Sequence, residues 1–161
     1  MSAKLSKEEF VKVVAATPLV SIDLIVRNDD GEVLLGKRLN KPAQDYWFVP
    51  GGRILKDELI ASAFDRLVRA ELGLRLKLDD ATFLGTYQHL YPDNFADEPN
   101  VTTHYVVLAY LVQLSAEQCD QAGLLGDDQH AEQGWWHVAG LLASGQVHTN
   151  TKAYFDPAYK T

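Results

Sequence analysis

Cysteine is nearly absent from this chain: Cys119 is the one cysteine among 161 residues. A single cysteine excludes an internal disulfide framework and is typical of a protein that folds in a reducing compartment. The apolar runs are far shorter than a membrane span, and the first residues lack the basic and apolar regions of a signal peptide. We therefore expect a cytoplasmic protein that does not enter a membrane.

Positive charge is also scarce, because 15 Lys and Arg residues face 22 Asp and Glu residues, for a formal net charge of −7. This balance argues against a broad basic face for nucleic acid, so an anionic ligand must be bound by a few locally placed arginines. Linkers, repeats and low-complexity tracts are absent as well. With 47% hydrophobic residues, the chain suits one domain spanning residues 1–161.

Hydrophobic periodicity and turn signals predict an α/β sandwich. Ser6 and Glu9 form a capping box at a helix start, Asp30-Gly31 marks a hairpin turn, and Gly73 is a left-handed helix stop. Strands on both sides of a central helix are typical of an α/β fold. We predict helices at 6–16, 57–72, 115–118, 138–144 and 149–155, and strands at 19–28, 32–39, 47–50, 84–91, 102–114 and 134–138.

Glycine, glutamate and arginine recur at fixed spacing in residues 50–74. Glu58 follows Gly52 by six positions, Arg66 comes eight later, and Glu71 and Gly73 end the segment. This spacing resembles the Nudix box, G-x5-E-x7-R-E-U-x-E-E-x-G-U, where U is a bulky aliphatic residue; Val68 and Leu74 fit it too. The resemblance implies a Nudix-type α/β/α sandwich with a mixed β-sheet and a catalytic loop-helix-loop at 52–74. An ordinary amphipathic helix is the alternative.

Two positions depart from the box, because Leu67 and Ala70 stand where glutamate is usual. Positions 67, 70 and 71 share one helix face, which here keeps only the carboxylate of Glu71. One carboxylate can help to hold one Mg²⁺, but not the two or three metals of typical Nudix enzymes. We expect Leu67 to pack toward the sheet. The helix is therefore either retuned for other chemistry or inactive.

Segments outside the box extend the resemblance, namely "TPLVSID", "LLGKR", "YWFVPGGR", "THYVVL" and "DDQH". In this order they resemble the GDP-mannose mannosyl hydrolase branch, which also lacks those two glutamates and cleaves at carbon. The resemblance implies one Mg²⁺ per subunit, held by the Gly51 carbonyl, Glu71 and Gln129. It also implies a homodimer, a GDP-sugar substrate and a supporting role in polysaccharide biosynthesis.

The same resemblance implies roles for several side chains. Arg38 and Arg53 would bind the diphosphate, and His130 would be the general base for a water on the far face of the sugar, which inverts the product. Asp23 and Tyr105 would support the departing charge. For Asp23, in the apolar strand "SIDLIV", a buried ion pair with an arginine is the alternative.

Four further residues are indicated less directly by the sequence. Leu5 and Phe10 match a segment that covers guanine across the dimer in this branch, although Phe10 also has the spacing of a hydrophobic staple on its own helix. His89 and Asp93 border the loop near residue 95 and could reach the sugar. Tryptophans at three positions are assigned to the core: Trp47, Trp135 and Trp136.

Three functions remain open from sequence. The first is hydrolysis of GDP-mannose, or of a related GDP-hexose such as GDP-glucose, at the glycosidic C1–O bond. The second is ordinary Nudix pyrophosphatase activity, which cleaves P–O bonds. The third is a GDP-sugar sensing module without catalysis. The residues do not specify the sugar.

Overall fold

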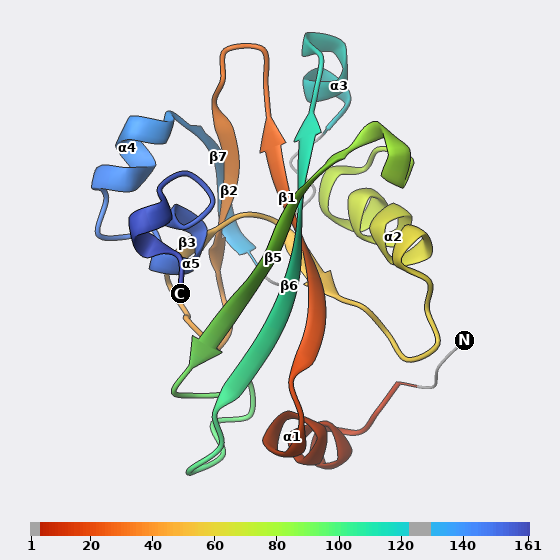
Figure 1. Cartoon of the computed structure of the whole chain (residues 1–161), viewed down its shortest axis with the longest axis vertical. Coiled ribbons are helices and arrows are strands. Elements are labelled where there is room, and N and C mark those ends of the chain that lie inside the picture. Colours follow the sequence, from red (N-terminus) through yellow and green to blue (C-terminus); the bar gives the residue numbers. More distant parts are fainter. Residues whose placement is uncertain (1–3, 123–129) are drawn as a thin grey trace.

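The structure is a computed structural model that describes residues 4–122 and 130–161. Five α-helices and seven strands are assigned within these residues (Figure 1). The helices are α1 (Lys7–Ala16), α2 (Ile60–Leu72), α3 (Ala116–Gln121), α4 (Val138–Ala143) and α5 (Thr149–Lys152). The strands are β1 (Leu19–Arg27), β2 (Val33–Arg38), β3 (Trp47–Phe48), β4 (Gly51–Arg53), β5 (Thr82–Tyr91), β6 (Thr103–Gln113) and β7 (His130–Trp136). Two 3₁₀ turns, Leu78–Asp80 and Pro157–Tyr159, complete the elements.

The strands form one mixed sheet in the order β3-β2-β1-β6-β5, with β4 paired to β1 and β7 paired to β2. β1 and β6 run parallel, and the other pairs are antiparallel. Helix α2 lies on one side of the sheet, and α4 and α5 lie on the other (Figure 1). The predicted α/β/α sandwich with a mixed sheet is confirmed.

Side chains along β1 alternate between the two faces of the sheet, and each face has its own apolar core. Ile22 and Leu24 point toward α2 and pack with Phe64 and Val68 in one apolar cluster. Ile25 belongs to a second cluster on the opposite face, together with residues of β2, β6 and α4. Asp23 lies between Ile22 and Leu24, so its side chain faces away from α2.

Local signals at several element ends are confirmed. The capping box of Ser6 and Glu9 forms as predicted, and Gly73 ends α2 with a φ of 66°. The start of α2 was placed too early, at 57, because Asp57 has a φ of 65° and the helix begins at Ile60. The final helix was predicted to be longer than it is, since α5 ends at Lys152, and β7 is longer than the predicted 134–138.

None of the helices within the described ranges is both long and apolar enough to span a bilayer.

Candidate active site

An arginine clamp fixes the loop that precedes α2. Arg66 donates from Nε to Glu58 Oε1 at 2.7 Å, and its terminal nitrogen donates to Glu58 Oε2 at 2.9 Å and to the Arg53 carbonyl at 2.8 Å. Glu58 also accepts from the Leu55 amide at 2.9 Å. The hydrogen bond from Arg66 lowers the pKa of Glu58, so the carboxylate stays charged and the clamp stays closed. These two motif residues hold the backbone of Arg53 in place.

Leu67 packs between α2 and β4, as expected from sequence. It is 4% exposed, and a Cβ built on Gly52 would lie 2.5 Å from its Cδ2. A larger residue at position 52 would therefore force the Leu67 side chain to move. Glu71, one turn farther along the same helix face, is 6% exposed, whereas Ala70 is exposed. The position that is usually a metal-binding glutamate is here part of the apolar core.

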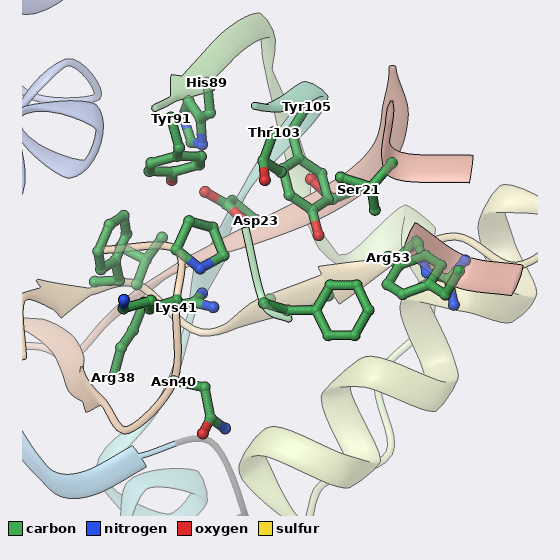
Figure 2. Close-up of a pocket in the computed structure, with 18 residues that line it drawn as sticks. Ser21, Asp23, Arg38, Asn40, Lys41, Arg53, His89, Tyr91, Thr103 and Tyr105 are labelled. Atoms are coloured by element: carbon green, nitrogen blue, oxygen red, sulfur yellow. The ribbon is translucent and has the colours of Figure 1, made fainter. Parts of the chain in front are cut away.

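A cavity of about 350 Å³ opens on the sheet face opposite α2. Residues from β1, β4, β5 and β6 form its floor, and α1 and two loops form its rim. Arg38 and Lys41 lie opposite His89, Tyr91 and Thr103 (Figure 2). The lining residues are Phe10, Val14, Ser21, Asp23, Arg38, Asn40, Lys41, Pro42, Phe48, Val49, Gly51, Gly52, Arg53, His89, Tyr91, Phe95, Thr103 and Tyr105.

Cations outnumber carboxylates among the side chains that line this cavity. The Arg53 guanidinium lies over the Phe10 ring at 4.2 Å, and Arg38 lies over Phe48 at 5.5 Å. The buried Nε of Arg38 has no hydrogen-bond partner among the described residues. Lys41 pairs with Asp97 at 2.8 Å. Two arginines held against aromatic faces are suited to bind an anionic group.

Asp23 is hydrogen-bonded to a tyrosine. The Tyr154 hydroxyl donates to Asp23 Oδ2 at 2.5 Å and lies 3.3 Å from His89 Nε2. Burial raises the pKa of Asp23 to about 6, although the Tyr154 hydrogen bond and the charge of Arg38 act in the opposite direction. Burial also lowers the pKa of His89 to about 4, so this imidazole is neutral near pH 7. Arg38 thus acts on Asp23 through charge, while Tyr154 makes the direct contact.

The comparisons with known proteins place the chain in a family. A model of the NUDIX domain matches residues 17–156. The chain belongs to the Nudix family. It is 37% identical over 131 residues to the low-salt glycan biosynthesis protein Agl8 of Haloferax volcanii, a match that covers 81% of this chain and 78% of that protein.

Solved structures agree on the Nudix fold. The MutT NUDIX hydrolase of Burkholderia pseudomallei is 26% identical with a TM-score of 0.65, and the match covers 86% of this chain and 97% of that one. The MutT protein of Methanosarcina mazei Go1 is 18% identical with a TM-score of 0.67, covering 89% and 94%. The chain is thus a Nudix hydrolase, and enzymes of this family act on small nucleotide substrates with divalent metals such as Mg²⁺ or Mn²⁺.

In this Nudix domain the cavity brings together most of the side chains that the sequence indicated. Tyr105 lines it, and burial raises the pKa of its phenol. Phe10 lines the cavity of its own chain, with its ring 4.9 Å from that of Phe95. The residues indicated from sequence that line the cavity are Phe10, Asp23, Arg38, Gly51, Arg53, His89 and Tyr105.

Other indicated residues lie elsewhere. Leu5 is 41% exposed and Asp93 lies beside the cavity, where its carbonyl accepts from Thr103 at 2.7 Å. The main chain of His130 pairs with Arg38 at the start of β7. Gln129 lies outside the described residues. Tyr154 was not anticipated, because it follows a short helix and reaches Asp23 across 131 positions of sequence.

The family resemblance assigns oxygen donors at Gly51 and Glu71 to one Mg²⁺. In the described part of the chain, no three His, Cys, Asp or Glu side chains are grouped to hold a metal. Gly51 lines the cavity, and a Cβ there would lie 2.4 Å from the Ile22 carbonyl, so only glycine fits. Glu71 is a buried residue of α2, the helix that packs against β4. A carbonyl and a carboxylate are oxygen donors that Mg²⁺ accepts together with several waters.

Proposed function

We propose that this Nudix hydrolase cleaves a GDP-sugar, GDP-mannose or a related GDP-hexose such as GDP-glucose, at the glycosidic C1–O bond. The products are GDP and the free sugar, with inversion at C1. The observation that carries the proposal is the packing of Leu67 against Gly52, which leaves Glu71 as the one carboxylate on the helix face that usually binds several metals. A helix with this face is poorly suited to activate water at phosphorus.

Cleavage at carbon makes different demands. GDP is a weak base when it leaves, so it needs stabilisation of its growing negative charge more than it needs a proton. Arg38 and Arg53 reach the cavity from β2 and β4, and the Nε of Arg38, which has no partner within the described part of the chain, offers a donor to a phosphate oxygen. Arg53, whose carbonyl accepts a hydrogen bond from Arg66, would contact the bridging oxygen.

Gly51, Glu71 and Gln129 would hold one Mg²⁺, which when bound supplies further electrostatic stabilisation of the diphosphate. The protein side chains then complete the site around the sugar. His130 would accept the proton of the attacking water, and its main chain lies opposite Arg38 in the sheet. Asp23 and Tyr105 would stabilise positive charge on the sugar and orient the diphosphate, and neutral His89 would hydrogen-bond a sugar hydroxyl.

The relative from Haloferax volcanii supports a sugar-containing substrate, because its name places it in glycan biosynthesis. Glycan synthesis consumes activated sugars, and a nucleotide sugar combines that chemistry with the nucleotide substrates of the Nudix family. We include in the same proposal a cytoplasmic location, a homodimer with Leu5 and Phe10 near the nucleobase, and Asp93 near the sugar.

Hydrolysis of GDP-mannose with Mg²⁺ in ¹⁸O-labelled water tests the proposal. Label in the released sugar is expected, and NMR of the first-formed anomer should show inversion. Label in a phosphate would overturn carbon attack in favour of the pyrophosphatase reading. Tight binding without turnover of GDP-mannose or GDP-glucose would instead indicate a sensing module. ADP-ribose, a ligand of a fold-related Nudix domain from Shewanella oneidensis, is the control substrate.

A further inference from the structure

The C-terminal segment, residues 149–161, delivers a hydroxyl to the cavity floor. Tyr154 follows α5, and its ring meets Tyr87 of β5 edge-on, with centroids 4.7 Å apart. Two further contacts tie the segment to β5: Lys160 lies over the Tyr87 ring at 4.5 Å, and Thr161 Oγ1 donates to the Gln88 carbonyl at 3.4 Å. These contacts anchor the segment to β5 at Tyr154 itself and on its C-terminal side.

We propose that Tyr154 is a positioning residue of this active site, whose hydroxyl bridges Asp23 and His89 and fixes both side chains for the sugar. Its effect on turnover rests on the proposed function, whereas the bridge itself does not. Tyr154 does not line the cavity, so it acts through the two residues that do.

The direction of each hydrogen bond follows from counting protons. A tyrosine hydroxyl has one proton, and the 2.5 Å contact to Asp23 Oδ2 uses it. His89 Nε2, 3.3 Å from the same oxygen, must then be the donor. Tyr154 thus selects the His89 tautomer that carries its proton on Nε2 and leaves Nδ1 as an acceptor.

Asp23 is held through one of its two oxygens. Its Oδ2 accepts from Tyr154, and its Oδ1 lies beside β4, 2.7 Å from where a Cβ on Gly51 would stand. The hydrogen bond from Tyr154 restricts the rotation of this carboxylate. Because catalytic geometry must be kept within roughly 0.5 Å, a second residue that fixes the rotamer affects the rate more than the affinity.

The test compares Tyr154→Phe with Tyr159→Phe, which removes a hydroxyl from the same segment at a residue that does not line the cavity. The first readout needs no substrate: long-range ¹H–¹⁵N correlation spectra at about neutral pH report the tautomer of a neutral histidine. Wild-type His89 should show the Nε2–H form. Tyr154→Phe should shift its ¹⁵N signals toward a mixture of tautomers, and Tyr159→Phe should not.

The second readout is the split between kcat and KM for GDP-mannose. Tyr154→Phe should lower kcat by ~10-fold or more, the factor that corresponds to one lost hydrogen bond to a charged group, and leave KM nearly unchanged. A wild-type His89 with its proton on Nδ1 would overturn the proposal without any variant. An unchanged tautomer in Tyr154→Phe, or a loss expressed only in KM, would overturn it as well. If GDP-mannose is not a substrate, the tautomer comparison still decides the bridge, so the two proposals fail separately.

Discussion

Restoring glutamate at position 67 should destabilise the protein before it changes the chemistry. Leu67 is 4% exposed, belongs to the core cluster between α2 and the sheet, and contacts Gly52. Leu67→Glu therefore places a carboxyl group where the surroundings are apolar. The same change at Ala70, which is exposed on the same helix, is the matched control.

Two costs add in the Leu67 variant. Losing the buried leucine forfeits about 1.5–3 kcal/mol of transfer free energy, and burying a polar group without a partner costs about 1–3 kcal/mol more. The sum, about 2.5–6 kcal/mol, is a large part of the 5–15 kcal/mol that stabilises a typical domain. At roughly 2–4 °C per kcal/mol for a chain of this size, Tm should fall by roughly 5–24 °C.

Thermal and urea unfolding, followed by circular dichroism with and without Mg²⁺, measure this loss. Ala70→Glu should change Tm by no more than about 2 °C, because an exposed helix position loses only helix propensity. The ¹⁸O assay on the Leu67→Glu/Ala70→Glu double variant then reports where cleavage occurs. A double variant that is as stable as wild type and places label in phosphate would refute the core role assigned to Leu67.

Four other substitutions test the site. Glu71→Gln should leave a folded protein, by circular dichroism, and weaken the Mg²⁺ dependence of turnover, so an unchanged Mg²⁺ titration would contradict the ligand assignment. His130→Gln should lower kcat by about 10²–10⁴-fold with little change in KM for GDP-mannose, and a His130 variant with normal kcat would place the base elsewhere. Arg53→Gln should lower kcat while the pH dependence of the reaction stays in place. At about pH 7.5, Asp23→Asn should stabilise the fold by about 2–3 kcal/mol in urea unfolding, whereas at about pH 4 it should not stabilise it. The same variant should lower turnover. The sign follows from the pKa of Asp23, which folding raises from 3.8 to about 6. The stability that wild type has below the unfolded-state pKa is lost as pH rises through the folded-state pKa. Equal effects of Asp23→Asn at both pH values would contradict this reasoning.

The Nudix box predicted the fold and the central helix because its residues act over short distances. Gly52, Arg66 and Gly73 each have a local structural task, which their spacing reveals. The same motif misled at the start of α2, since Glu58 has helical periodicity but accepts hydrogen bonds from Arg66 and Leu55 as part of the preceding loop. A motif states which residues recur, and not whether each lies inside the helix.

The contacts within the cavity were less accessible to prediction. Asp23 was recognised as costly in an apolar strand, and an arginine was the natural partner to expect from sequence. The structure supplies Tyr154 instead, from a segment whose sequence reads as a short helix. Such pairings depend on how the C-terminal segment returns to β5, which hydrophobic periodicity does not encode.

Strand β4 lies between helix α2 and the cavity and connects the two. Its three residues, Gly51, Gly52 and Arg53, all line the cavity, and the position of a side chain at Gly52 is directed toward Leu67 on the α2 side. Arg66 joins the two sides, because it extends from α2 to the Arg53 carbonyl. A leucine at position 67, where the Nudix box usually has a glutamate, therefore changes the α2 side without disturbing the arginine and carboxylate groups that line the cavity. Under the proposed function, that separation would allow the same box to support chemistry at carbon, where charge stabilisation near the diphosphate matters more than a cluster of metals.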